Sequence, residues 1–212
     1  EPEPEPEPKA DLSGPSQYVQ ITTENWSDSS NITRTNMKEH TDIISSQARY
    51  GYGNATSGNY LIIGASQEYY GDNTTTQTGL VYLYEYDENT NTWNTGTTLY
   101  PVTNDRAHNF GERISISGDY IAISSGQTYV WYDSNGNSSF TNNGGSMKIA
   151  GVIEIYKLNN GIWSHVNRIA TPNLNRHTYI GDDAGLDIYH SGNDCYIAVG
   201  EYKYNEWRGA VH

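Results

Sequence analysis

The chain has 212 residues with 12 basic and 25 acidic side chains, so its formal net charge is −13. Such a charge repels phosphate backbones and anionic membranes, which argues against nucleic-acid binding and favours cationic or basic partners. Tyr (19) and Gly (21) are abundant, Phe (2) is scarce and helical patterns are few, so the composition favours short strands joined by polar turns.

Apolar runs and cysteine content indicate whether the chain could enter a membrane or form disulfides. No apolar run approaches the roughly 18 residues of a membrane helix, so we expect no direct insertion into a membrane. The single cysteine, Cys195, has no partner for a disulfide within the chain. Its strand context, SGNDCYIAVG, predicts a small buried thiol.

Residues 1–15 contain an alternating Glu-Pro run and read EPEPEPEPKADLSGP. Proline cannot donate to a sheet, and the like charges resist collapse, so this stretch is expected to be an extended linker. Two interpretations stay open: a stalk that leads into the folded part, or a tail without a role. Residues 16–212 are expected to form the folded domain.

Residues 110–169 form the clearest unit of that domain. Four runs rich in β-branched and aromatic residues follow one another there, each bounded by Gly, Asn or Asp. The runs lie at 112–117, 120–124, 152–158 and 163–169. Turn residues at 117–119 and 159–161 tolerate positive φ and suit hairpins. The unit is therefore predicted to be one four-stranded antiparallel meander.

Anchor residues indicate that this unit recurs along the chain. Three pairs of glycines, each seven residues apart, precede an apolar strand: Gly51 and Gly58, Gly111 and Gly118, and Gly185 and Gly192. Trp26, Trp93 and Trp163 recur at intervals of roughly 70 residues and are expected in equivalent positions. We assign a partial repeat to 18–33, whole repeats to 50–99 and 110–169, and a partial repeat to 184–212.

These repeats predict an all-β fold, a β-propeller-like array of four-stranded antiparallel meanders. About three blades are visible, whereas closed propellers have roughly four to eight. We therefore expect either a longer propeller or copies that complete one another. Strand edges left unpaired at the two ends of the array are expected to recruit other strands, from the same gene product or from another copy.

Three glycine-anchored motifs suggest a family. They are FG-x6-GDYIAIS at 110–124, YG-x6-GNYLIIGA at 50–65 and AG-x6-GNDCYIAVG at 184–200, and they are followed by GLVYLYEY, GVIEIYKL or GAV. In these motifs the chain resembles the FG-GAP repeats of the integrin α-chain type of β-propeller, over nearly everything from Tyr18 to His212. The resemblance implies a propeller fold, an adhesion or assembly role, and calcium-binding loops.

The family's calcium loop has no good match in this sequence. The nearest segment has oxygen-bearing side chains at alternate positions, Asp133, Asn135 and Asn137, but only one carboxylate. These three residues are the candidate calcium ligands, and calcium is the one cofactor considered. A solvated turn of Asn, Gly and Ser is the alternative interpretation.

Five Asn-X-Ser/Thr sequences are possible N-glycosylation acceptors. Asn54 aligns with isoleucines that should face the interior, so its acceptor is expected to be unused. Asn31 alternates with a core-facing residue, and Asn73 and Asn137 lie in predicted long loops, so these three are the expected sites. Asn25 is a further candidate. Chance is the alternative, because a chain rich in Asn, Ser and Thr generates such sequences freely.

The six histidines and the paired acids Asp182 and Asp183 show no catalytic or metal-ligand spacing, so we expect no enzyme. Loop aromatics are better candidates for contacts with proteins or sugars, unless they cap the sheets as ordinary packing. They are Tyr69, Tyr70, Trp131, Tyr132, Tyr202, Tyr204 and Trp207.

Taken together, these features favour a non-enzymatic glycoprotein module for adhesion or structural assembly. The module is expected to be extracellular, on a cell surface or on a virion surface, with protein partners or self-assembly. The alternative is a lectin-like or glycan-processing propeller that uses the aromatic loops.

Overall fold

The computed structural model describes residues 48–70, 73–90, 92–94, 96–102, 109–142, 144–170, 180–181, 185–192, 194–201 and 210–211. All of them belong to one compact unit, Asp42–His212. Strands account for every regular element, and the described residues contain no helix.

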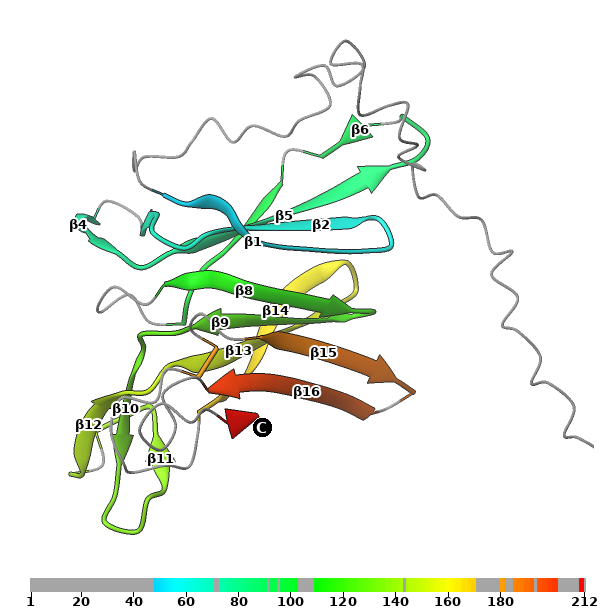
Figure 1. The fold of residues 1–212 in the computed structure, drawn as a ribbon. Helices are drawn as coiled ribbons and strands as arrows, with labels where there is room; N and C mark the ends of the chain where they lie inside the picture. Colours follow the sequence, from blue (N-terminus) through cyan, green and yellow to red (C-terminus); the bar gives the residue numbers. More distant parts are fainter. Residues whose placement is uncertain are drawn as a thin grey trace, which may run out of the picture. The chain divides into compact units, whose positions relative to one another are not determined.

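Three of the antiparallel sheets share one design (Figure 1). Sheet 1 contains β1 (Tyr50–Ser57), β2 (Tyr60–Ala65), β5 (Leu80–Asp87) and a fourth strand in two segments, β6 (Thr92–Trp93) and β7 (Thr97–Leu99). Sheet 2 contains β8 (Phe110–Ser117), β9 (Tyr120–Ser125), β13 (Val152–Asn159) and β14 (Ile162–Ile169). Sheet 3 contains β15 (Leu186–Ser191), β16 (Asp194–Glu201) and β17 (Ala210–Val211). The predicted all-β fold of antiparallel meanders is confirmed.

Strand pairing shows that the sheets are structural repeats. In sheet 1 Trp93 pairs with Tyr86 of β5, and in sheet 2 Trp163 pairs with Leu158 at the same place in β13. Trp93 and Trp163 are therefore equivalent, as predicted, whereas Trp26 lies outside the described residues.

The sheets stack in chain order with their first strands as neighbours. β8 packs against β1 on one side and against β15 on the other. Figure 1 shows the hairpins β1–β2, β8–β9 and β15–β16 one above the next. This is the propeller-like arrangement that the repeats predict.

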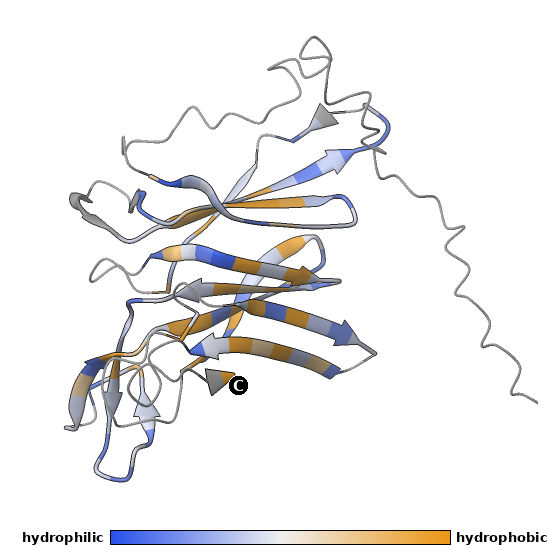
Figure 2. Ribbon diagram, viewed as in Figure 1, coloured by the Kyte–Doolittle hydropathy of each residue, from blue (hydrophilic) through white to orange (hydrophobic). Residues whose placement is uncertain are grey.

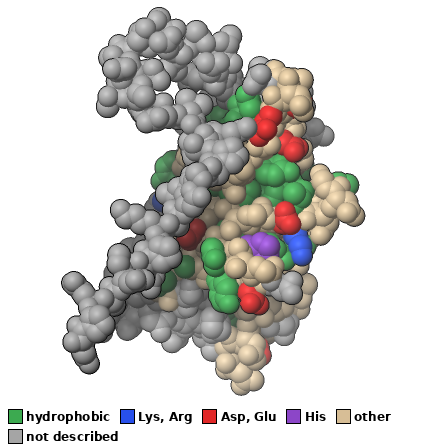
Figure 3. All heavy atoms as spheres, turned by 90° about the vertical axis from the view of Figure 1, so that its right-hand side faces the viewer, with side chains coloured by type: hydrophobic (Ala, Val, Ile, Leu, Met, Phe, Trp, Pro, Cys, Tyr) green, Lys and Arg blue, Asp and Glu red, His purple; other side chains and the backbone are tan. Residues whose placement is uncertain are grey.

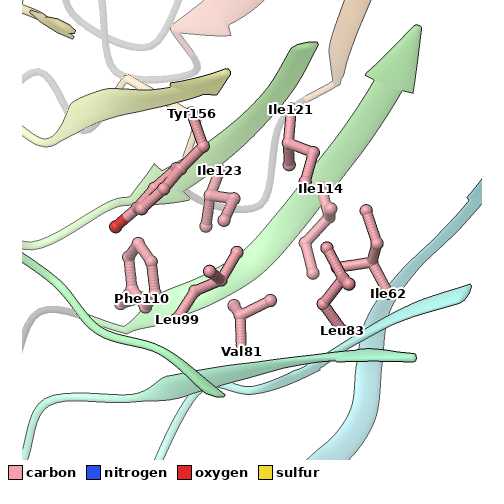
Figure 4. Close-up of a cluster of buried hydrophobic side chains, with 9 residues drawn as sticks. All are labelled: Ile62, Val81, Leu83, Leu99, Phe110, Ile114, Ile121, Ile123 and Tyr156. Atoms are coloured by element: carbon pink, nitrogen blue, oxygen red, sulfur yellow. The ribbon is translucent and has the colours of Figure 1, made fainter. Parts of the chain in front are cut away.

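A hydrophobic core fills each space between sheets. Figure 2 shows hydrophobic and hydrophilic residues alternating along β8 and β15, so that one face of each strand is apolar. The core between sheets 1 and 2, drawn in Figure 4, consists of Ile62, Val81, Leu83, Leu99, Phe110, Ile114, Ile121, Ile123 and Tyr156. The core between sheets 2 and 3 consists of Ala122, Ile153, Ile155, Ile180, Ile188 and Val199. Each large aliphatic side chain buried in this way contributes about 1.5–3 kcal/mol.

Serine hydroxyls also join sheets 2 and 3. The backbone amides of Ile188 and His190 in β15 donate to Ser115 Oγ at 3.1 Å and to Ser117 Oγ at 3.0 Å. The Ser115 hydroxyl in turn donates to Asp187 Oδ1 at 2.9 Å. These bonds satisfy amides at an edge of sheet 3 that another strand would otherwise pair with.

The first glycine of each whole repeat forms a bulge in the first strand. Gly51 has φ +87° and Gly111 has φ +90°, and the pairing of β1 with β2 and of β8 with β9 shifts register there. Only glycine adopts such φ values without strain. A side chain on Gly111 would also meet Val81 Cγ2 at 2.6 Å, so the glycine lets sheets 1 and 2 approach closely.

The third repeat begins earlier than its sequence alignment suggests. Ile180 pairs with Glu201, and its backbone amide donates to the carbonyl oxygen of Ala150. In the second repeat, Phe110 pairs with Ser125 in the same way, and its amide donates to the carbonyl oxygen of Thr78. The Phe110–Gly111 position is therefore taken by Ile180–Gly181, with Gly181 at φ +68°, and not by Ala184–Gly185.

Additional hairpins replace the loops predicted between second and third strands. In sheet 1 this connection forms β3 (Tyr69–Tyr70) and β4 (Asn73–Gln77), and in sheet 2 it forms β10 (Tyr129–Tyr132), β11 (Ser138–Ser139) and β12 (Ser146–Ile149). The larger insertion is anchored by a small core that comprises Val130, Tyr132, Ala150 and Val152.

Candidate interaction surfaces

The turn between β10 and β11 is organised by one carboxylate. Asp133 Oδ1 accepts hydrogen bonds from the backbone amides of Asn135 and Asn137 at 2.8 and 2.9 Å, and Oδ2 accepts one from Asn137 Nδ2 at 2.8 Å. These donors, the Asn137 side chain foremost, lower the pKa of Asp133 below its ordinary value of 3.8.

This turn does not fit the calcium site that the resemblance implies. Both carboxylate oxygens of Asp133 already accept bonds from the loop itself, and Asn137 faces Asp133 with its amide nitrogen, which cannot ligate a hard cation. In the part of the chain that the structure describes, no group of three or more His, Cys, Asp or Glu side chains could hold a metal ion.

The glycosylation candidates have different positions. Asn137 is exposed at the turn, and Asn73 is the first residue of β4, whereas Asn25 and Asn31 lie outside the described residues. Asn54 is exposed, so the expectation that it faces the interior was wrong. Ile114, its counterpart in β8, is buried because that side of sheet 2 packs on sheet 1.

The aromatic residues predicted in loops have different positions. Tyr132 is only 1% exposed and belongs to the small core under the insertion, so it contributes packing and no contact surface. Trp131, next to it, points to the other side of β10, pairs with Met147 and Ser139 and is half-buried. Tyr69 and Tyr70 form β3, and Tyr202, Tyr204 and Trp207 lie outside the described residues.

Sequence reasoning missed a second aromatic group at the hairpin ends of the sheets. The rings of Tyr60 and Trp163 meet edge to face at 5.5 Å, and those of Tyr86 and Trp93 lie 5.1 Å apart. Burial, and then the Glu85 carboxylate, raise the pKa of the Tyr60 hydroxyl. Figure 3 views this end and shows hydrophobic side chains among acidic ones. The recurrence of tryptophan in the sequence is the signal that points to this group.

Lys157 and His190 both lie against one aromatic ring near this end. Lys157 Nζ lies 4.9 Å from the centre of the Tyr120 ring, and the imidazole of His190 lies 4.8 Å from it. His165 is placed elsewhere in sheet 2, with Nε2 3.3 Å from the buried Glu154 carboxylate. His190 therefore packs on an aromatic ring, and His165 lies beside a carboxylate.

The face of sheet 3 that points away from sheet 2 carries exposed apolar side chains. Tyr189 of β15 and Tyr196 of β16 pair directly, are 61% and 60% exposed, and stack with ring centres 6.5 Å apart. Val211 of β17 is 80% exposed. We call the surface formed by Tyr189, Tyr196, Ala198 and Val211 the outer face of sheet 3.

Cys195 is exposed, so the predicted buried thiol was wrong. It pairs with His190 next to the turn that joins β15 and β16. At this position the hairpin projects beyond the part of sheet 3 that packs into the core with sheet 2, which ends at Ile188 and Ile197.

None of the described residues forms a helix long and apolar enough to cross a membrane. No protein-family model matches the chain, and no similar sequence was found among curated proteins.

Proposed function

We propose that this chain is a non-enzymatic module for adhesion or structural assembly that works outside the cell, on a cell surface or on a particle surface. The outer face of sheet 3 carries the proposal, because two stacked tyrosines and a valine are exposed there. Tyrosine is enriched where proteins meet, since its large ring combines apolar area with a hydroxyl.

The repeat geometry supports the family part of the proposal. Two whole repeats share the glycine bulge, the tryptophan position and the packing of one sheet on the next. We propose that these sheets are blades of FG-GAP-like repeats. The acidic surface, with a net charge of −13, and the exposed acceptor Asn137 suit a soluble glycoprotein module.

Photo-cross-linking of the full chain tests the binding role. A photoreactive benzoylphenylalanine replaces Tyr196, and the protein is irradiated in extracellular fluid or membranes of its source. The matched control carries the same group at Tyr52, which is 46% exposed in β1. We expect a protein, of either another kind or the same kind, to be cross-linked from position 196 and not from position 52. Equal labelling from both positions contradicts the proposal.

A carbohydrate-binding or glycan-processing role is the second candidate. The aromatic pairs at the hairpin ends favour it, because Trp93 is 37% exposed and aromatic faces bind sugar rings well. A glycan array and a hydrolase screen on the full chain separate the two roles. Saturable sugar binding that is lost in Trp93→Ala, or turnover of a glycan, makes this second candidate the better one.

A further inference from the structure

We infer that the hairpin end of the sheets binds a basic segment of a partner protein, rich in lysine and arginine. The hairpin end comprises the turns β1–β2, β5–β6, β8–β9, β13–β14 and β15–β16, which lie on the right in Figure 1 and face the viewer in Figure 3. The inference rests on the proposed function and names the chemistry of a partner. The distribution of charge and the aromatic rings at this end support it.

Exposed acidic side chains gather at the hairpin end. Of the exposed carboxylate residues in the part of the chain that the structure describes, all but Asp187 lie in these turns or within three residues of one. They are Glu85, Asp87, Glu88, Asp119 and Asp194. Asp187 accepts a hydrogen bond from Ser115 instead. The described residues therefore present most of their exposed negative charge at one end.

Basic side chains lie mostly elsewhere. Among the described residues, Lys157 is the one lysine or arginine within three residues of these turns. The guanidinium groups of two others lie 5.5 and 5.3 Å from the ring of Tyr52, near the start of β1. The basic residues remote from the turns are Arg49, Arg113, Lys148 and Arg168. The described part of the chain therefore leaves most of the charge at the hairpin end uncompensated.

Aromatic rings lie among these carboxylates. Glu85 pairs with Tyr60 across sheet 1, and the Tyr60 ring meets Trp163 of sheet 2 edge to face. Burial raises the pKa of Tyr60, and the Glu85 and Asp119 carboxylates raise it further, so a carboxylate of each sheet lies near this ring pair. Trp93, in the β5–β6 hairpin of sheet 1, is 37% exposed. The surface therefore combines carboxylates with aromatic faces.

This combination fits lysine and arginine side chains. A carboxylate pairs with the cation, and the face of a tryptophan or tyrosine within about 6 Å also attracts it. A metal ion fits less well, because among the described residues no group of three or more His, Cys, Asp or Glu side chains could hold one. The carboxylates are instead spread over the turns of all three sheets, so a segment with several basic side chains engages them together.

Binding at the hairpin end differs from general attraction by charge. The net charge of −13 attracts any polycation, and salt screens that attraction wherever it acts. Only binding at the hairpin end depends on the particular carboxylates and rings that lie there. Variants with the same net charge therefore separate the two effects.

Fluorescence anisotropy of a labelled octa-arginine peptide, titrated with the full chain, tests the site. Combined Glu85→Gln and Asp119→Asn substitutions should weaken binding about fivefold or more, since two carboxylates beside the ring pair lose their charge. The matched control, Glu5→Gln with Glu7→Gln, removes the same charge from the Glu-Pro run and should weaken binding less than about twofold. Absence of saturable binding at about 50 mM salt, or equal weakening in the two double variants, overturns the inference.

Nuclear magnetic resonance of the unsubstituted protein gives an independent answer. The same peptide should shift the indole N–H signals of Trp93 and Trp163, while that of Trp131, in the insertion of sheet 2, should stay in place. Trp93→Leu should weaken binding of the peptide, and Trp131→Leu, its matched control, should not. Equal shifts of all three signals overturn the inference. If position 196 cross-links to a partner while the peptide fails to bind the hairpin end, the proposed function holds and this inference fails.

Discussion

Asp133 shows how one side chain can organise a loop through hydrogen bonds. Its carboxylate accepts three hydrogen bonds from N–H groups of the turn between β10 and β11. Asp commonly stabilises turns in this way. The same alternation of oxygen side chains in the sequence suggested calcium. Spacing alone cannot distinguish a ligand from a turn residue, because both need short polar side chains at alternate positions.

Replacing Asp133 by Ala is expected to loosen this loop alone. The amides of Asn135 and Asn137 should exchange with deuterium faster, since they lose their acceptor. The pKa of Asp133 is lowered in the folded chain, so the ordering is present above pH 3.8 and is lost as the pH falls through the lowered value. Ser134→Ala is the control, and hydrogen exchange at pH 6 and pH 3 is the measurement. Unchanged exchange at pH 6 would contradict the assignment.

Tyr156 joins sheet 2 to the end of sheet 1. Its hydroxyl donates to the carbonyl oxygen of Tyr100 at 2.6 Å, and its ring packs on Phe110 in the first core. Burial, and then the Glu154 carboxylate, raise the pKa of this hydroxyl far above its ordinary value of 10.0. The fold therefore requires the neutral phenol.

Tyr156→Phe is expected to lower the free energy of unfolding by about 1 kcal/mol at pH 7, since one buried hydrogen bond is lost. Because the pKa of Tyr156 is raised in the folded chain, the stabilisation that its hydroxyl provides is complete below pH 10.0. This stabilisation is lost as the pH rises above that value. The variant should therefore lose less stability than the wild type between pH 9 and pH 11. Urea unfolding at both values measures this, with the exposed Tyr196→Phe as control. Equal alkaline losses in all three proteins would rule out the role of Tyr156.

At the scale of elements, glycines decide how closely the sheets approach. A Cβ on Gly64 would lie 2.0 Å from the carbonyl oxygen of Gly111 in the next sheet. A Cβ on Gly58, in the β1–β2 turn, would meet nothing within 4 Å, although its φ is +53°. Gly64 therefore allows the two sheets to pack closely, whereas Gly58 is needed only for the turn.

This difference predicts unequal effects of alanine. Gly58→Ala should cost about 1 kcal/mol, which is the cost of a positive φ for a residue with a side chain. Gly64→Ala should cost about 3 kcal/mol or more, because two backbones must separate and the neighbouring core loses contacts. Thermal and urea unfolding of both variants provide the comparison. Similar losses in the two variants would mean that the sheets are not in close contact at Gly64.

Much of the element pattern could be predicted from the sequence. Runs of β-branched and aromatic residues gave the strands of sheets 1 and 2 to within a few residues, because those strands are short, apolar on one face and bounded by turn residues. The equivalence of Trp93 and Trp163 followed from their spacing, since both lie on fourth strands that pair at the same register.

The start of the third repeat and the burial of several residues depend on contacts between sheets, so local sequence patterns could not predict them. The first position of the third repeat is Ile180–Gly181 because additional residues precede β15, and only hydrogen bonding to Ala150 and pairing with Glu201 reveal this. Asn54 aligns with the buried Ile114, and Cys195 lies in a strand, but both are exposed, since no described sheet covers Asn54 and Cys195 lies next to the β15–β16 turn. Tyr132 was assigned to a binding loop, but the insertion folds over it.

At the scale of the whole molecule, the described strands place sheet 2 between its two neighbours, since β8 packs against β1 and against β15. Sheet 2 shares one core with sheet 1 and a separate core with sheet 3, and the two cores have no residue in common. In arrays of this kind, stability is approximately a sum of sheet and interface contributions. Weakening one interface should therefore release one end of the array and leave the other end folded.

Paired substitutions in the two cores test this independence. Ile188→Ala, in the core between sheets 2 and 3, should cost about 2–5 kcal/mol and accelerate hydrogen exchange in Leu186–Glu201 while β1 and β2 stay protected. Ile62→Ala, in the core between sheets 1 and 2, should reverse the pattern, because both residues are buried but belong to different interfaces. Hydrogen exchange measured peptide by peptide distinguishes the two ends. A uniform rise along the chain in both variants would show that the three sheets unfold as one cooperative unit and that the interfaces are coupled through sheet 2.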